Sequence, residues 1–276
     1  MATRRLDAVF IGGYTKSGTT LTGRAFDLIN TVYAKGEFDF FRIFAERTGL
    51  LFKEYNKNIA IVNREVYDNR GSLNPVSTSL VRRIQRDIFL KVFFAGEQVP
   101  DDCQVIVEKS PRNVFHLAEI RAIFPASQNV IVYREPKAVF RSLCRHLADH
   151  RDPRYFDPDF DYRQQVLVKM ERRWNNLTAI IEAESGAKDI HIVRYDAINA
   201  DKAGFLDYVQ KKILRRELGL KGPVSSLDKE SYLASLPPEQ REISLVQSSA
   251  NRLSLSEREI EFIDSRMKLP EVEFDY

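Results

Sequence analysis

A glycine-rich loop near the start of the chain is the feature that most restricts the fold. The loop, GGYTKSGTTLTG at residues 12–23, follows a short apolar run, DAVFIG at 7–12. Beyond it, apolar residues recur at helical spacing: Leu21, Ala25, Leu28, Ile29 and Val32. The short run predicts a buried strand, and the spacing predicts a helix that ends at Gly36. A strand, a glycine loop and a helix in this order are typical of α/β proteins that bind an anion at the loop.

The alternation of strand and helix returns later in the chain. We expect strands at 103–110, 129–135 and 189–195, and helices at 77–95, 113–124, 136–150 and 205–218. Ser256 and Glu259 have the spacing of a capping box before a last helix. Apolar strands between amphipathic helices predict a central parallel sheet flanked by helices on both faces, a three-layer α/β fold like that of P-loop proteins. A ligand is expected beyond the carboxyl ends of the strands.

Length and charge limit the remaining possibilities. A chain of 276 residues that is 43% hydrophobic can bury one large core, so we expect a single domain over residues 1–276. The segments 37–102 and 150–175 lack the regular alternation and are expected to form insertions or a lid over the site. The formal net charge of +3 does not indicate a nucleic-acid partner, so any anion site must be a local arrangement.

Neither a disulfide framework nor a membrane segment is predicted. Cys103 and Cys144 are too few for such a framework in a chain of this length, and we interpret them as buried thiols in a reducing compartment. The first apolar run is too short for a signal peptide, and no stretch approaches the roughly 18 apolar residues of a membrane span. The sequence therefore predicts a cytoplasmic protein without a transmembrane segment.

The glycine loop resembles the phosphate loop of nucleoside triphosphate enzymes, but its lysine is displaced. Gly13 and Gly18 have the spacing of the G-x-x-x-x-G-K-[ST] motif, whereas Thr19 occupies the lysine position and Lys16 lies earlier. Backbone N–H groups at residues 18–20 can hold a phosphate without a metal. We find no apolar strand that ends in a magnesium-binding aspartate. These features favour a donor whose transferred group carries less charge than a γ-phosphate, such as a sulfuryl group.

Two motifs together resemble those of the sulfotransferases that use 3′-phosphoadenosine 5′-phosphosulfate (PAPS). YTKSGTTL at 14–21 is similar to the family's 5′-phosphosulfate loop, and YREPKAVFRSL at 133–143 is similar to its 3′-phosphate motif. In the latter motif an arginine ends a strand and a serine lies eight residues on, as Arg134 and Ser142 do. EKSPRN at 108–113 resembles a segment of Golgi and bacterial members, and VRYDAI at 193–198 resembles a strand end near the adenine.

The resemblance implies which residues bind the donor and its product, adenosine 3′,5′-bisphosphate (PAP). Five residues of the glycine loop would hold the 5′-phosphosulfate end: Lys16, Ser17, Gly18, Thr19 and Thr20. The rest of the nucleotide would contact four others: Arg134 and Ser142 at the 3′-phosphate, Tyr195 near the adenine, and Arg252 from the C-terminal region. Lys16 would also stabilise the bridging oxygen, and Lys109 would assist at the sulfonate. No metal is expected.

Transfer to a hydroxyl also needs a base. In the cytosolic small-molecule members the base is a histidine two residues after a lysine, but here Pro111 follows Lys109 at that distance. The resemblance therefore points to the members with a glutamate base, and AKGEFDFF at 34–41 indicates Glu37. Because a helix that ends at Gly36 leads away from the phosphate, the chain must turn back for Glu37 to reach the donor. Glu65 and Glu108 are weaker candidates.

The acceptor and two other functions stay open at this point. A glycan, a glycolipid and a small metabolite all suit segments with aromatic residues and with the basic residues Arg42, Arg64 and Arg70. A P-loop kinase that uses ATP and magnesium, and a non-catalytic nucleotide-binding module, are the alternative functions. His146 and His150 have a spacing that could bind a metal, but we identify no third ligand, although Asp149 and Asp152 are near, and we interpret the pair as part of a polar helix end. Trp174 is interpreted as a core residue.

Overall fold

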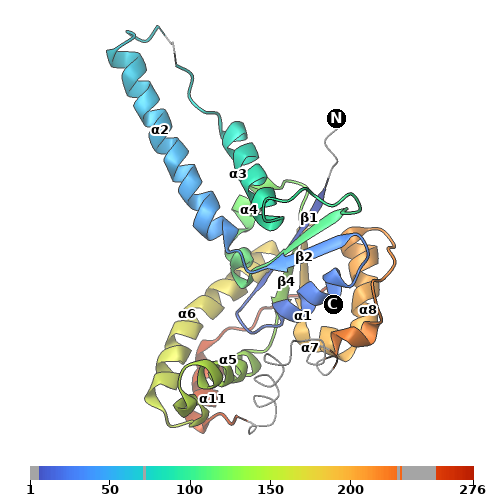
Figure 1. Cartoon of the computed structure of the whole chain (residues 1–276). Coiled ribbons are helices and arrows are strands. Elements are labelled where there is room, and N and C mark those ends of the chain that lie inside the picture. Colours follow the sequence, from blue (N-terminus) through green and yellow to red (C-terminus); the bar gives the residue numbers. More distant parts are fainter. Residues whose placement is uncertain (1–5, 71–72, 229–230, 232–252) are drawn as a thin grey trace.

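A sheet of five parallel strands forms the centre of the computed structural model, which describes residues 6–70, 73–228, 231 and 253–276 (Figure 1). The strand order is β2-β3-β1-β4-β5. In chain order the strands are β1 (Asp7–Gly13), β2 (Val32–Gly36), β3 (Val105–Lys109), β4 (Gln128–Tyr133) and β5 (Ile190–Arg194). All four pairings are parallel, so the carboxyl ends of the strands lie at one edge of the sheet.

Helices cover both faces of this sheet. Successive strand residues point to opposite faces, so Ala8 and Phe10 of β1 enter one core, and Val9 and Ile11 enter the other. The first core contains α3 (Thr78–Phe93), α4 (Leu117–Ile123), α5 (Pro136–His150), α6 (Asp161–Glu184) and α11 (Glu257–Arg266). The second contains α1 (Thr19–Asp27), α7 (Tyr195–Ala200), α8 (Lys202–Tyr208) and the π-helix η4 (Val209–Leu214). The predicted three-layer α/β fold is therefore confirmed.

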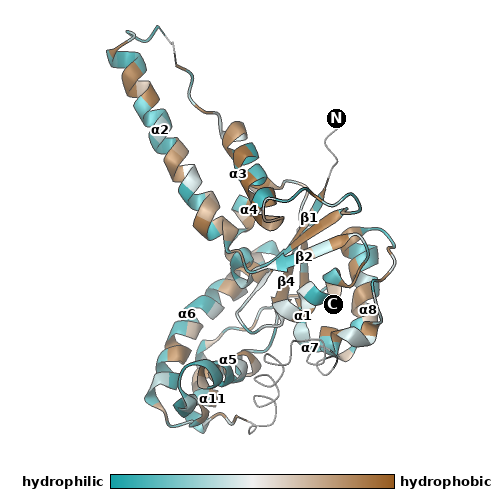
Figure 2. Ribbon diagram, viewed as in Figure 1, coloured by the Kyte–Doolittle hydropathy of each residue, from teal (hydrophilic) through white to brown (hydrophobic). Residues whose placement is uncertain are grey.

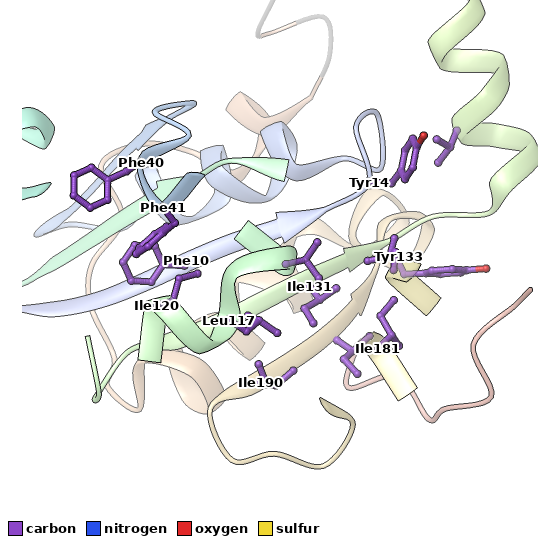
Figure 3. Packing of buried hydrophobic residues seen from close by; sticks show 14 of the residues in the cluster. Phe10, Tyr14, Phe40, Phe41, Leu117, Ile120, Ile131, Tyr133, Ile181 and Ile190 are labelled. Atoms are coloured by element: carbon purple, nitrogen blue, oxygen red, sulfur yellow. The ribbon is translucent and has the colours of Figure 1, made fainter. Parts of the chain in front are cut away.

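Aromatic residues fill one end of the first core (Figure 3). The ring of Phe10 packs edge-on against Phe41, with centroids 5.2 Å apart, and Phe40 packs edge-on against Phe89 at 5.1 Å. Phe40 and Phe41 belong to the segment that follows β2, where the π-helix η1 (Phe41–Ala45) begins. These rings therefore anchor the chain just beyond β2 to the centre of the molecule.

The prediction of a helix that continues to Gly36 is wrong for the second half of that segment. Helix α1 ends at Asp27, and residues 32–36 form the edge strand β2, which pairs with β3 from Val32 opposite Val105 to Gly36 opposite Lys109. The apolar spacing misled the prediction because Leu28, Ile29 and Val32 enter the same core from a turn and a strand. Strand β2 runs back to the carboxyl edge of the sheet, so it provides the return of the chain that Glu37 requires.

Most other predicted elements are confirmed, with differences at their ends. Helix α5 has the predicted bounds, and α11 begins with the predicted capping box of Ser256 and Glu259. The helix expected at 113–124 begins earlier, as the 3₁₀ turn η2 (Pro111–His116), and the helix expected at 205–218 is divided into α8 and η4. Cys103 and Cys144 are buried, as predicted.

The two segments without regular alternation contain long helices. Helix α2 (Glu46–Glu65) extends away from the sheet beside α3 and buries only Ile59 (Figure 1). Brown and teal alternate along it in Figure 2, and its apolar residues are not confined to a buried face, since Leu50 and Leu51 are 61% and 62% exposed. The sequence pattern therefore did not predict it. The 24-residue helix α6 occupies most of the other segment. In the described part of the chain no helix is long and apolar enough to cross a membrane.

A buried ion pair joins α6 to α11. Arg163 donates from Nε to Oε1 of Glu259 and from Nη2 to Oε2, both at 2.8 Å. The side chains of Arg163 and Glu259 are 1% and 3% exposed, so water cannot solvate either charge if its partner is removed. On the same helix Trp174 is fully buried and donates from Nε1 to the carbonyl oxygen of Lys268 at 2.8 Å, as a core residue should.

We predict that Glu259→Gln lowers the free energy of unfolding by about 3–5 kcal/mol, because it leaves the buried charge of Arg163 uncompensated. Urea unfolding followed by the fluorescence of Trp174, the single tryptophan, measures this loss. Glu257→Gln is the matched control, since Glu257 is exposed in the first turn of the same helix. Equal shifts of the unfolding midpoint in the two variants would contradict a stabilising role for the pair.

Candidate active site

A cavity of about 640 Å³ lies at the carboxyl edge of the sheet. Residues that follow all five strands contribute to its wall, from the loop after β1 to the start of α7 after β5. It brings together eight of the residues predicted from the sequence: Lys16, Gly18, Thr19, Thr20, Glu37, Arg134, Ser142 and Tyr195. Ser17 lies in the glycine loop and Lys109 lies at the end of β3, but neither residue lines the cavity. Arg252 lies outside the described residues.

The loop after β1 requires glycine at position 18. Gly18 has a φ of 107°, and α1 begins directly after it at Thr19. A Cβ atom at Gly18 would lie 2.1 Å from Cδ2 of Tyr195, so only glycine lets the Tyr195 ring pack on the loop. The N–H groups of the first helical turn, at Thr19 and Thr20, have no partner within the helix. The loop therefore offers backbone donors to the cavity at the positive end of α1.

Two buried polar atoms beside this loop have no hydrogen-bond partner among the described residues: Ser17 Oγ and Arg134 Nε. Arg134 follows β4, donates from Nη1 to the carbonyl oxygen of Lys16 at 3.2 Å, and holds its guanidinium 4.3 Å from the centre of the Tyr195 ring. Buried donors without a partner are rare in folded proteins. Arg134 lines the cavity, so an oxygen of a phosphate-bearing ligand would satisfy its Nε, and this residue fits the predicted nucleotide. Ser17 is fully buried and does not line the cavity.

Glu37 is connected to the glycine loop by Lys109. The Nζ of Lys109 donates to Oε1 of Glu37 at 2.5 Å and to Oγ1 of Thr20 at 3.4 Å. The side chain of Glu37 is 60% exposed and that of Lys109 is 14% exposed, so the carboxylate is accessible while the ammonium is held in place. A Cβ atom at Gly36 would lie 2.3 Å from the carbonyl oxygen of Lys109, so glycine permits this close approach of β2 to β3.

The charge of Lys16 is partly removed from water. Burial lowers the pKa of Lys16 below the ordinary lysine value, and the nearby ammonium of Lys109 lowers it further. The carboxylates of Glu37 and Asp149 act in the opposite direction. A partly desolvated ammonium gains more from an anionic partner than a solvated one does. The position of Lys16 therefore suits a ligand with negative charge.

Glu108, a weaker candidate for the base, lies beneath the cavity and does not line it. Its carboxylate is 1% exposed and accepts hydrogen bonds from Ser110 Oγ and Asn113 Nδ2, both at 2.6 Å, and from the N–H of Phe38 at 3.2 Å. Burial raises its pKa. These bonds join the segment after β2 to the segment after β3, so Glu108 positions the neighbours of Glu37. Glu65 lies at the far end of α2, paired with Arg64.

Some cavity residues were not predicted from the sequence: Asp39, Ser110, Arg112 and His146. The first three belong to AKGEFDFF and EKSPRN, so the motifs were identified but not each contributing side chain. His146 follows Ser142 by one helical turn and thus shares its face of α5. The rings of His146 and His150 are 4.4 Å apart. Among the residues that the structure describes, no group of three or more His, Cys, Asp or Glu side chains could hold a metal ion.

Comparisons with known proteins concern the family and the fold of the chain. The model of the sulfotransferase family matches residues 8–213. A comparison with curated protein sequences found no match. A solved sulfotransferase from Alicyclobacillus acidocaldarius is 16% identical, with a TM-score of 0.50 over 88% of this chain and 96% of that chain. At this identity the likeness shows the fold alone.

Two further solved structures are similar at lower TM-scores. The sulfotransferase domain of the olefin synthase from Synechococcus PCC 7002 is 15% identical, with a TM-score of 0.47 over 98% of both chains. Sulfotransferase STF1 from Mycobacterium tuberculosis H37Rv is 13% identical, with a TM-score of 0.46 over 88% of this chain and 76% of that chain. The matched family range covers well over half of the 276 residues and contains every predicted site residue except Arg252. The chain therefore belongs to the sulfotransferase family.

Proposed function

We propose that the protein transfers a sulfuryl group from PAPS to a hydroxyl group of a glycan, a glycolipid or a small metabolite. Membership of the family gives sulfuryl transfer in general, and it favours this function over a P-loop kinase. One observation carries the choice of donor and base: a single cavity is lined by the glycine loop, by Arg134 with Ser142, and by Glu37. A donor with phosphate at both ends of its ribose suits the first two groups.

In this proposal the donor lies across the carboxyl edge of the sheet. The N–H groups of residues 18–20 and the ammonium of Lys16 hold the 5′-phosphosulfate, and Ser17 contributes as a buried residue of the same loop. Arg134 and Ser142 hold the 3′-phosphate, and the Tyr195 ring lies near the adenine. Support comes from the unpartnered Nε of Arg134 and from the contact between Arg134 and Tyr195. In the proposed reaction no metal takes part.

The acceptor oxygen forms a bond to sulfur while the bond from sulfur to the bridging oxygen of the donor breaks. Glu37 takes the proton of the acceptor hydroxyl. The electron pair of the broken bond stays on the bridging oxygen of the departing PAP, where Lys16 stabilises the developing charge. Lys109 is close enough to Glu37 and Thr20 to stabilise the sulfonate oxygens during transfer.

We further propose that the chain acts as a single domain in which the segments 37–102 and 150–175 shape the acceptor side of the site. Glu37 and Asp39 from the first segment line the cavity, which supports this role. We also propose the cytoplasm as the location. The buried free thiol of Cys144 supports a reducing compartment.

We predict that Glu37→Gln lowers kcat by about 10²- to 10⁴-fold, because an amide cannot take the acceptor proton. The affinity for PAP should not fall, since Glu37 contacts the acceptor and the loss of its negative charge leaves Lys16 and Lys109 more positive. The assay incubates the protein with sulfur-labelled PAPS and an extract of metabolites and oligosaccharides, identifies the labelled product, and then measures turnover with that acceptor. Calorimetric titration with PAP gives the affinity.

Glu65→Gln is the matched control for this substitution. The side chain of Glu65 is 61% exposed, against 60% for Glu37, but it lies at the end of α2 and does not line the cavity. Its turnover should equal that of the native protein. Normal turnover in Glu37→Gln, or an equal loss in both variants, would show that Glu37 is not the base.

We predict that the affinity for PAP begins to fall at a pH below the ordinary lysine pKa of 10.5. Burial lowers the pKa of Lys16, so its binding-competent ammonium is complete below this lowered pKa and is lost as the pH rises through it. The phosphates of PAP do not titrate in this range, since their second pKa is about 6. Calorimetric titrations at increasing pH measure the dissociation constant.

Lys16→Arg is the control for this pH dependence, because a guanidinium stays charged throughout the range. Its dissociation constant should change less with pH than that of the native protein, whatever its absolute value. Loss of one charge-assisted hydrogen bond is worth about 1.5–3 kcal/mol, so the native change should reach at least about tenfold. The same pH profile in both proteins would exclude Lys16 as the titrating contact.

A further inference from the structure

A second cavity, of about 300 Å³, adjoins the first on the other side of the glycine loop. Thr15, Pro111 and Arg112 line both cavities. A molecule that reaches from one cavity into the other therefore passes over these three residues. None of the roles in the proposed sulfuryl transfer uses the second cavity.

Three arginines from separate parts of the chain line the second cavity: Arg42 of η1, Arg112 of η2 and Arg173 of α6. Arg42 and Arg173 come from the two segments predicted to shape the acceptor site. Because these residues are far apart in the sequence, their meeting at one cavity is a product of the fold and not of a local basic run.

The positive charge of these arginines is only partly balanced. Asp39 accepts from Arg42 at 2.8 Å and lies 3.8 Å from Arg112. Within the described ranges Arg173 makes no ion pair, although its charge acts on the hydroxyl of Tyr14. Three guanidinium groups thus line this cavity, and Asp39, which lines the first cavity, is the carboxylate near two of them. Arg42 and Arg112 have 44% and 45% of their side chains exposed, so both remain accessible to a ligand.

The rest of the cavity wall suits the body of an organic molecule. Tyr14 and Phe115 supply aromatic surface, and Tyr14 is anchored in the first core, where its ring lies 5.6 Å from that of Trp174. Asn176, one turn beyond Arg173 on α6, supplies a polar group. Aromatic surface beside guanidinium groups is the combination that holds a ring or short chain bearing an anionic substituent.

We propose that the second cavity binds an oxyanion of the acceptor, so that the acceptor is a hydroxyl compound that also carries a carboxylate, a sulfate ester or a phosphate. The inference rests on the proposed function and narrows its acceptor class. Guanidinium groups bind such oxyanions through paired hydrogen bonds, which a neutral acceptor cannot form. Asp39 holds Arg42 and Arg112 at the cavity when no acceptor is bound, and the uncommitted charge of Arg173 is the main attraction for the ligand.

Matched pairs of acceptors test this inference. The panel contains methyl β-glucuronide with methyl β-glucoside, 4-hydroxyphenylacetate with its amide, and glucose 6-phosphate and glucose 6-sulfate each with glucose. We predict that in at least one pair the anionic member has a kcat/KM about tenfold or more above its neutral partner. The pairs distinguish carboxylate, phosphate and sulfate ester as the source of the anion.

Arg173→Gln should remove most of this preference, because the KM for the anionic acceptor should rise about tenfold. The kcat for the neutral partner should stay unchanged. Arg172→Gln is the matched control, because Arg172 is also exposed on α6 but does not line the cavity. It should keep the full preference. The affinity for PAP, measured by calorimetry in each variant, should equal that of the native protein.

The outcomes separate this inference from the function on which it rests. Absence of PAP binding in the native protein would contradict the proposed function. Intact PAP binding with equal use of both members of every pair, or with use of none, overturns the inference alone. An equal loss for anionic and neutral acceptors in Arg173→Gln also overturns it, since that result would assign Arg173 a general structural role.

Discussion

The parallel direction of all five strands brings the site together. In this register Ile11 of β1 and Gly36 of β2 both lie opposite Lys109 of β3, and Gly13 lies opposite Val132 of β4. The segments that follow these strands therefore begin at one edge of the sheet, although they lie far apart in the sequence. Two cores on opposite faces of the sheet hold the strands in this register, so the stability of the fold and the geometry of the site have the same origin.

Close backbone approaches complete this arrangement. Gly18 admits the ring of Tyr195, and Gly36 lets β2 end against the carbonyl of Lys109. The buried carboxylate of Glu108 then fixes the turn after β2 by accepting from the N–H of Phe38. The ammonium of Lys16 is partly removed from water, and Nε of Arg134 has no hydrogen-bond partner among the described residues. Such preorganised donors need little rearrangement when an anionic ligand binds, which is the condition for strong electrostatic stabilisation of a transition state.

The sequence predicted those features that depend on local pattern. Strand β1, helix α5 and the capping box of Ser256 and Glu259 each have a short signal whose physical cause lies within a few residues. The motifs also led to Lys16, Glu37, Arg134 and Ser142, which the fold brings to one cavity. Their chemical roles remain proposals.

The sequence did not predict features that depend on tertiary packing. Apolar spacing could not separate a helix that continues to Gly36 from a turn and a strand, because Leu28 and Val32 are buried in the same core either way. Helix α2 was missed because it buries a single residue. The cavity of Arg42, Arg112 and Arg173 has no sequence motif, since its residues meet only through the packing of η1, η2 and α6.

The central claim is that one cavity recognises two phosphates of a nucleotide, one at the glycine loop and one at Arg134 and Ser142. Calorimetric titration of the protein with adenosine 3′,5′-bisphosphate and, separately, with adenosine 5′-monophosphate tests it most directly. The account predicts that the bisphosphate binds at least about tenfold more tightly, because charge-assisted hydrogen bonds to the 3′-phosphate are worth about 1.5–3 kcal/mol. Equal affinity for the two nucleotides, or no heat with the bisphosphate, would contradict it.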